Sequence, residues 1–195
     1  MDEVRLLIKG KERETYSIHY SCNGFYYGDA VAPTICAIAM TNLKTLEKHV
    51  FALHNYLNEG KCLIEAEKQL LTDFTNFFNK LKNPILMHWK MDDLEYGFKA
   101  IVARCENYGI YDISFSETRN INLGDYFYNG LHIILERYQC SSLDILSGKD
   151  EAICFNKRNF NAVKLSTIAK SVGLVNLINY AIKNGIDFNT KDDEE

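Results

Sequence analysis

The sequence has no excess of basic charge, and this absence limits the partners that the protein can bind. Its 195 residues contain 22 Lys and Arg against 26 Asp and Glu, which gives a formal net charge of −4 at pH 7. Nonspecific binding to phosphates depends on a surplus of Lys and Arg, so the composition argues against a general nucleic-acid binder. A local basic groove stays compatible with these numbers.

Several motifs that carry familiar chemistry are also missing. The five histidines show no HExxH or HxH spacing, which disfavours a zinc hydrolase. The sequence has no GxGxxG or GxxxxGK[ST] phosphate loop and no Gly-x-Ser-x-Gly nucleophile elbow. The six cysteines form no CxxC pair, and we expect free, mostly buried thiols at Cys22, Cys36, Cys62, Cys105, Cys140 and Cys154.

Export and membrane signals are absent too. The N-terminal segment MDEVRLLIKGKERET is charged throughout and lacks the apolar core of a signal peptide. No apolar run approaches the roughly eighteen residues that a membrane span needs. We therefore expect a cytoplasmic chain with no membrane partner and with reduced cysteines.

The apolar residues that are present alternate first and then recur with helical spacing. The early runs predict strands in an antiparallel meander, and a stripe with a period of 3.6 then predicts the clearest helix. Alternating strands and helices follow, so we predict an α/β fold: a mixed sheet flanked by helices, with a helical C-terminal part. The expected strands span 4–9, 15–21, 34–40, 48–55, 84–87 and 111–115; the expected helices span 63–81, 92–108, 123–138 and 159–184, with short turns over 141–153 and a candidate break at Gly173.

The chain has no internal repeat, linker or low-complexity block that would divide it. We therefore predict a single domain over residues 1–195. Its core spans 15–138, and C-terminal helices span 139–186. The acidic tail, 187–195, is expected to be disordered.

Glu67 is an acidic residue within the apolar stripe of the helix over 63–81. It lies four residues after Leu63 and three before Leu70, which places it on the core-facing side. Burying an unpaired carboxylate is costly. Four explanations stay open for Glu67: a frayed helix end near solvent, an ion pair, protonation, or a bound metal.

The stretch PILMHWKMDDLEYGF, residues 84–98, predicts a buried strand, a polar bend and a helix. Asp92 or Asp93 is suited to cap that helix, because a carboxylate can accept from its free N–H groups. α/β proteins commonly place a ligand site where a strand gives way to a helix.

Trp89 in this bend and Arg104 on the helix flank are candidate binding residues. Trp89 is suited to stack on a base and Arg104 to bind a phosphate, and both are suited equally to a protein interface. In the alternative interpretation, Trp89 covers the edge of the core, and Arg104 pairs with Asp93 or Glu67.

The expected order of elements resembles that of ribonuclease H-like domains, which include the DEDD-type 3′–5′ exonucleases. In HWKMDD, His88 and Asp93 match the His and Asp of the second exonuclease motif, and the upstream segment EAEKQLLTDF is similar to the Glu-rich helix of those families. The longer pattern HWKMDDLEYGFKAIVAR resembles a group of bacterial proteins in which His-Trp-Asn-Met-Arg is followed by Tyr-Gly-Phe and then Arg. The resemblance covers about residues 26–109, with a weaker similarity at 147–169.

This resemblance implies a nuclease site that is incomplete. Two-metal catalysis needs about four carboxylates to hold two divalent cations. Asp29 is the candidate for the first motif, but Val31 stands where its glutamate belongs, and the last motif, near 160–165, supplies no acid. The remaining candidate ligands for Mg²⁺ or Mn²⁺ are Asp29, Glu67 and Asp93, with His88 assisting catalysis.

Three hypotheses follow for the function. The first is a ribonuclease H-like domain with an incomplete metal tetrad, acting as an accessory or binding subunit in a bacterial nucleic-acid or phage-defence system. It expects another protein subunit as partner, nucleic acid as a further candidate, and no cofactor. The second is an active, divalent-metal-dependent 3′–5′ exonuclease or other nuclease. The third is a helix-turn-helix DNA-binding regulator, because IAKSVGL at 168–174 resembles the centre of that motif, although 174–182 contains no basic residue.

Overall fold

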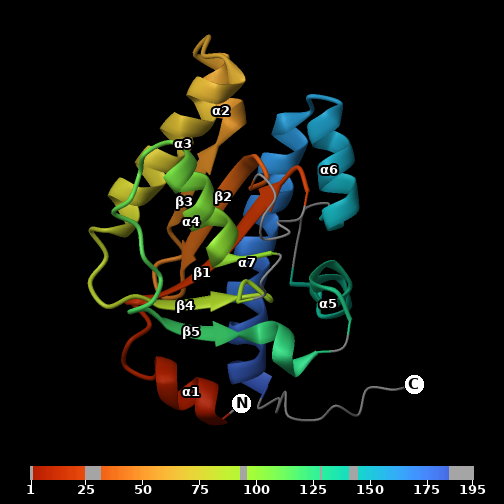
Figure 1. Cartoon of the computed structure of the whole chain (residues 1–195). Helices are drawn as coiled ribbons and strands as arrows, with labels where there is room; N and C mark the ends of the chain where they lie inside the picture. The colour runs from red at the N-terminus through yellow and green to blue at the C-terminus, as the bar shows by residue number, and fades with distance from the viewer. Residues whose placement is uncertain (1, 25–31, 93–95, 128, 141–144, 185–195) are drawn as a thin grey trace.

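A computed structural model describes residues 2–24, 32–92, 96–127, 129–140 and 145–184, and a five-stranded mixed sheet lies at its centre (Figure 1). The strands follow the order β3-β2-β1-β4-β5 across the sheet. β1 (Thr15–Cys22), β2 (Ile35–Asn42) and β3 (Lys48–Ala52) form an antiparallel meander, whereas β4 (Ile85–His88) pairs parallel to β1, and β5 (Arg119–Asn122) parallel to β4. The predicted α/β class, with its meander and mixed sheet, is confirmed.

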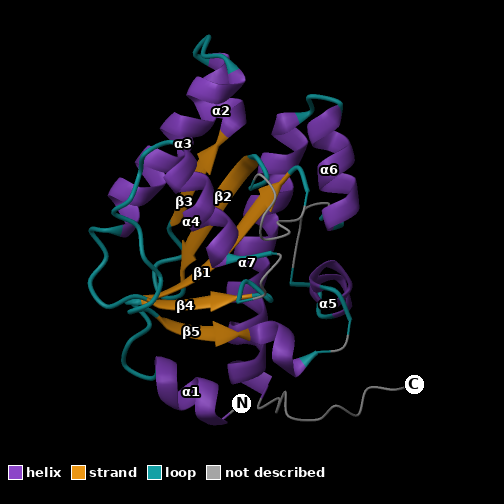
Figure 2. Ribbon diagram, in the orientation of Figure 1, coloured by secondary structure: helices purple, strands orange, loops and turns teal. Residues whose placement is uncertain are grey.

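Helices cover both faces of this sheet (Figure 2). α3 (Leu63–Phe78) and α4 (Phe98–Asn107) pack on one face, where they form one hydrophobic cluster with the strands. α7 (Phe160–Asn184) and α5 (Leu131–Arg137) contribute to a second cluster on the other face. The remaining elements are α1 (Asp2–Ile8), α2 (Leu53–Asn58), the 3₁₀ helix η1 (Leu123–Tyr126) and α6 (Gly148–Asn156).

β1 presents different side chains to its two faces, because successive residues of a strand point in opposite directions. Ile18 and Tyr20 are fully buried in the cluster with α3 and α4. On the other face, the Ser17 hydroxyl donates to the backbone oxygen of Ser171 in α7 over 2.7 Å. Small, mutually satisfied hydroxyl groups let α7 lie close to the sheet without leaving buried polar atoms unpaired.

α7 has the length and composition of a membrane span, so the expectation that no apolar run approaches such a span is wrong for this segment. Its most apolar window of 18 residues has a mean hydropathy of 1.2, and 61% of that window is buried inside the fold. The helix packs mainly on β1 and β2, so it contributes to the core of the fold. The predicted break at Gly173 is wrong: the helix continues through this glycine, where a Cβ atom would lie 2.5 Å from Cδ1 of Leu135.

The N-terminal segment is helical, so the predicted strand over 4–9 is wrong. Val4 and Ile8 are 1% and 2% exposed, whereas Leu6 between them is 73% exposed. A strand would put all three side chains on one face, but a helix brings residues four apart together. The spacing of Val4 and Ile8 is compatible with a strand or with a helix. Both residues pack into the cluster on the α7 side of the fold, and this packing stabilises the helix.

Four further boundaries differ from the prediction. β3 ends at Ala52, and the last residues of the predicted strand 48–55 belong to α2. Residues 111–115 are irregular, and the fifth strand is instead β5, whose sequence Arg-Asn-Ile-Asn carries no apolar alternation.

The helix expected over 92–108 begins at Phe98, so Asp92 does not cap it, and Asp93 lies outside the described residues. The helix expected over 123–138 is divided into η1 and α5, and the tail 187–195 also lies outside the described residues.

All six cysteines lie in the described part of the chain and are free, as predicted. Cys36, Cys105 and Cys140 are buried, Cys22 and Cys154 are partly buried, and Cys62 is exposed. Burial raises the pKa of the Cys105 thiol to about 11, which makes it a poor nucleophile at neutral pH.

Candidate functional site

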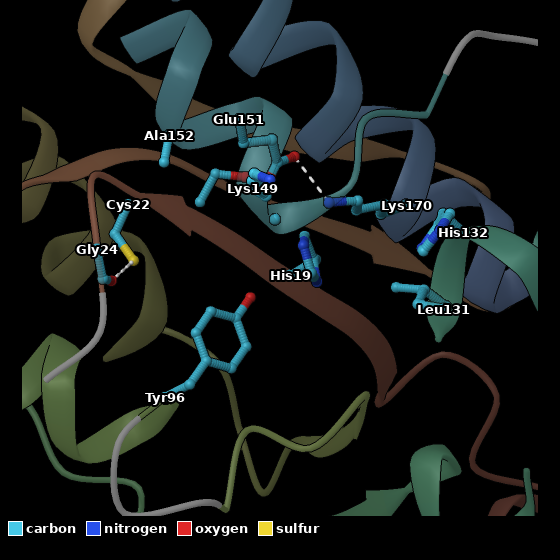
Figure 3. A pocket seen from close by; sticks show the side chains of 12 residues that line it. His19, Cys22, Gly24, Tyr96, Leu131, His132, Lys149, Glu151, Ala152 and Lys170 are labelled. Atoms are coloured by element: carbon cyan, nitrogen blue, oxygen red, sulfur yellow. Dashed lines mark hydrogen bonds and ion pairs between the residues drawn. The ribbon is translucent and has the colours of Figure 1, made fainter. Parts of the chain in front are cut away.

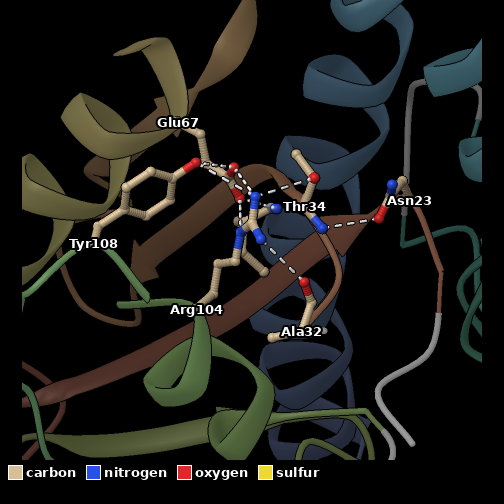
Figure 4. Close-up of polar contacts among 7 residues, drawn as sticks. Asn23, Ala32, Thr34, Glu67, Arg104 and Tyr108 are labelled. Atoms are coloured by element: carbon tan, nitrogen blue, oxygen red, sulfur yellow. Dashed lines mark hydrogen bonds and ion pairs between the residues drawn. The ribbon is translucent and has the colours of Figure 1, made fainter. Parts of the chain in front are cut away.

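Glu67 is buried between α3, α4 and the start of β2, and its carboxylate is fully engaged (Figure 4). Oε1 accepts from the backbone N–H of Ile35 and from Nε of Arg104, each over 2.7 Å. Oε2 accepts from Nη2 of Arg104 over 2.5 Å and from the hydroxyl of Tyr108 over 2.8 Å. The ion pair proposed as one explanation for Glu67 is therefore observed, with Arg104 as the cation.

Arg104 is held as firmly as the carboxylate that it neutralises. Besides Glu67, its guanidinium donates to the backbone oxygen of Ala32 over 3.2 Å and to Oγ1 of Thr34 over 3.3 Å. The hydrogen bond from its side chain to Glu67 raises the pKa of Arg104 further above its ordinary value. Burial, helped by the bond to Glu67, raises the pKa of Tyr108 to about 12. Arg104 and Glu67 thus form a bidentate ion pair, in which two guanidinium nitrogens donate to the two carboxylate oxygens. The hydroxyl of Tyr108 adds a further hydrogen bond to the carboxylate.

Two further candidates, His88 and Trp89, lie at the end of β4 and face the interior. His88 is fully buried; its Nδ1 accepts from the backbone N–H of Met91 over 3.2 Å, and its ring meets the edge of Phe98. Trp89 is 7% exposed and stacks on Phe127 with ring centroids 5.5 Å apart. The interpretation of Trp89 as a cover for the edge of the core therefore matches its position better than a surface stacking platform does.

A polar cluster that the sequence analysis missed lies beside His88, where β4 and β5 end. The side-chain amide of Asn122 donates to Oδ1 of Asp92 over 3.0 Å and to Oδ1 of Asp125 over 2.9 Å. Its oxygen accepts from the backbone N–H of Lys90 over 2.8 Å. A small cavity of about 240 Å³ lies here, lined by His88, Asp92, Asn122 and Asp125. In the sequence, the feature that could have indicated this site is an asparagine at the end of the polar strand Arg-Asn-Ile-Asn. Asn122 thereby ties the loop after β4 to the loop after β5.

A larger cavity opens at the end of β1. Among the described residues, β4 pairs with β1 at Thr15, Tyr16 and Ser17, and β1 then continues without it. The loop after β4 takes over: the Tyr96 hydroxyl donates to the backbone oxygen of Tyr20 over 2.7 Å, and the two rings stack. On the α7 side of this split lies a cavity of about 560 Å³ (Figure 3). The cavity lies at the end of the neighbouring parallel strands β1 and β4. From this pair the chain continues to β2 on one side and to β5 on the other. α/β sheets commonly bind ligands at such a position.

The structure brings two of the predicted site residues together and separates others. Glu67 and Arg104 form one cluster, whereas His88 packs on Phe98 and Trp89 on Phe127. Asp29 and Asp93 lie outside the described residues. In the part of the chain that the structure describes, no group of three or more His, Cys, Asp or Glu side chains is arranged to hold a metal ion. Metal binding by Asp29, Glu67 and Asp93 stays a prediction.

Comparison of the sequence with protein-family models and with curated proteins gives no match.

The buried imidazole of His88 predicts a loss of stability in mild acid. Burial lowers the pKa of His88 to about 4, against the opposing charge of Asp92. Below about pH 6.5 the unfolded chain takes up a proton that the folded chain excludes, so stability falls as the pH falls. Between about pH 7.5 and 5, His88 should lower the free energy of unfolding by about 2 kcal/mol, measured by urea titration at each pH.

The matched variant is His88→Asn, whose side-chain oxygen can accept from the N–H of Met91 but does not titrate. The difference in unfolding free energy between wild type and variant should shift by about 2 kcal/mol toward the variant at the lower pH. Parallel pH profiles for the two proteins would contradict the assignment of a neutral, buried His88.

Proposed function

We propose that this chain is a ribonuclease H-like domain without a complete metal tetrad, acting as a binding or accessory subunit of a bacterial nucleic-acid or phage-defence system. The strand order β3-β2-β1-β4-β5 supports the proposal, with β2 antiparallel to β1 and with β1, β4 and β5 parallel. So do the helices on both faces of the sheet. The meander, the mixed sheet and the flanking helices are features expected from the resemblance to ribonuclease H-like domains.

The observation that carries the non-catalytic part of the proposal is the state of the Glu67 carboxylate. Both of its oxygens accept two hydrogen bonds, and the partly buried guanidinium of Arg104 supplies its counter-charge. A divalent cation at Glu67 would have to displace Arg104 and leave that guanidinium partly buried without its partner, which is costly. Glu67 is therefore better suited to join α3 to α4 than to hold a metal.

The residues of the HWKM…YGF…R motif also have structural roles. His88 and Met91 are fully buried, and Tyr96 stacks on Tyr20. Gly97 leaves no room for a side chain, because a Cβ atom there would lie 1.8 Å from the backbone oxygen of Met91. Arg104 completes the motif by pairing with Glu67. These contacts indicate that the motif residues stabilise the fold. The bacterial defence setting is inferred from the resemblance of the motif alone.

The proposal predicts no metal-dependent cleavage. Purified protein should leave labelled single- and double-stranded DNA and RNA intact in Mg²⁺ or Mn²⁺, to the same extent as an Asp93→Asn variant. Fluorescence anisotropy on the same substrates measures whether nucleic acid is itself the partner. Cleavage by the wild type that the Asp93→Asn variant lacks would overturn the proposal in favour of an active nuclease.

A further inference from the structure

The cavity at the end of β1 is lined by both apolar and charged side chains. The apolar side chains of Leu131 and Ala152 line it, together with Cys22 and the ring of Tyr96. The charged side chains are those of Lys149, Glu151 and Lys170, with His19 beside them (Figure 3). A volume of about 560 Å³ lies within the range of sites for small organic ligands.

His19 is the feature that points to a ligand. Its side chain is 5% exposed, and neither ring nitrogen has a hydrogen-bond partner among the described residues. Burial and the charge of Lys170 lower the pKa of His19 well below its ordinary value, so the ring is neutral and offers one donor and one acceptor. Buried polar atoms without partners are costly and rare, and each one needs an explanation.

A buried ion pair lies beside this ring in the wall of the cavity. Nζ of Lys170 is 2.8 Å from Oε1 of Glu151, and both side chains are 5% exposed. The same oxygen accepts from the hydroxyl of Ser166 over 2.7 Å. An ammonium group has three hydrogens, and Glu151 is the one ion-pair partner found for Lys170 within the described ranges. Lys170 therefore keeps donor capacity toward the cavity.

The first turn of α6 adds positive potential beside these charged side chains. Gly148 and Lys149, its first two residues, line the cavity. Ser147 caps the helix by accepting from the N–H of Asp150, and the N–H of Glu151 bonds to the Ser147 backbone oxygen. The first two amides of a helix have no partner within the helix, and the helix dipole favours an anion beside them. Two ammonium groups thus face a single carboxylate, so the charged lining is positive.

We propose that this cavity binds a small organic anion, with an apolar or aromatic body against Leu131 and Ala152 and a carboxylate or phosphate beside Lys149 and Lys170. His19 contributes the hydrogen bonds that its ring does not make within the protein. The site is separate from the described candidates for nuclease chemistry, because neither Glu67 nor His88 lines it.

The test is calorimetric titration of the full chain with two anionic probes and their neutral counterparts. Adenosine 5′-monophosphate is compared with adenosine, and indole-3-acetate with indole-3-ethanol; inorganic phosphate tests whether an anion alone is sufficient. At least one organic anion should bind with a Kd below about 10 mM and at least about tenfold more tightly than its neutral counterpart. Binding of adenosine 5′-monophosphate would indicate a phosphate ligand such as a nucleotide, whereas binding of indole-3-acetate would indicate a carboxylate ligand.

Two variants separate binding from folding. His19→Phe removes ring nitrogens that lack partners in the protein, so it should fold with equal or higher stability but bind at least about tenfold more weakly. Lys149→Gln should weaken binding similarly, whereas Lys164→Gln, on the exposed part of α7 beside Asn55, should not. Failure of both anions to bind at about 10 mM, equal binding of the neutral counterparts, or unchanged binding in His19→Phe would overturn the proposal.

Discussion

Replacing Arg104 by methionine should lower the free energy of unfolding by about 3–5 kcal/mol, because the substitution leaves the Glu67 carboxylate buried without a cation. Glu67 is 1% exposed and Arg104 14% exposed, so water cannot solvate the remaining charge without local opening. Methionine keeps much of the length of the arginine stem, which limits the loss of packing. Urea denaturation followed by circular dichroism measures the change.

The Lys61–Glu59 pair provides the matched control. Its atoms are 2.7 Å apart, but the side chains are 33% and 57% exposed, so Lys61→Met should cost at most about 1 kcal/mol. Combining Arg104→Met with Glu67→Leu should restore much of the stability, because the unpaired charge is removed together with its partner. A loss for Arg104→Met no larger than that for Lys61→Met would show that Glu67 does not depend on Arg104.

Replacing Gly97 by alanine should have a second large effect, lowering the free energy of unfolding by about 3 kcal/mol or more. Gly97 has a φ of +152°, and a Cβ atom there would lie 1.8 Å from the backbone oxygen of Met91. That oxygen accepts from the N–H of Phe98, at the start of α4, and the N–H of Gly97 donates to the hydroxyl of Tyr20. The loop after β4 must move to admit the new atom, and both bonds are then lost.

Gly109→Ala separates the steric effect from the cost of the backbone conformation. Gly109 has a φ of +74°, and a Cβ atom there would meet no other part of the described chain within 4 Å, so this substitution should cost about 1 kcal/mol. Thermal and urea denaturation of the two variants provide the comparison. Equal losses at the two glycines would mean that the loop after β4 accommodates a side chain and that its close approach to Met91 is not needed.

The elements that the sequence predicts well are those with one dominant apolar pattern. β2 begins with an unbroken apolar run, Ile35–Met40, and is buried along its whole length. α3 has a stripe with a period of 3.6 whose buried residues include Leu70, Leu71 and Phe74. In both cases burial alone determines the local structure, so a local pattern is enough to predict it.

The elements that it misses are determined by contacts distant in the sequence. β5 contains one apolar residue, Ile121, and is a strand because β4 pairs with it. Residues 89–92 and 96–97 form a loop, rather than the first turns of a helix, because of Tyr20, Asn122 and the backbone of Met91. The candidate sites differ in the same respect. Helical spacing predicts that Glu67 lies on the core-facing side, and Arg104 was one of the partners considered for it. His19, Glu151 and Lys170 lie on three separate elements, and no short motif connects them.

Mn²⁺ titration monitored by electron paramagnetic resonance tests whether Glu67 stabilises the fold or binds metal. Free Mn²⁺ gives a strong signal that bound Mn²⁺ loses, so the titration counts sites without requiring activity. We predict that wild type and Glu67→Gln leave the same free Mn²⁺ concentration at every point. A Mn²⁺ site that is present in the wild type and absent from the folded Glu67→Gln protein would contradict the structural role of Glu67.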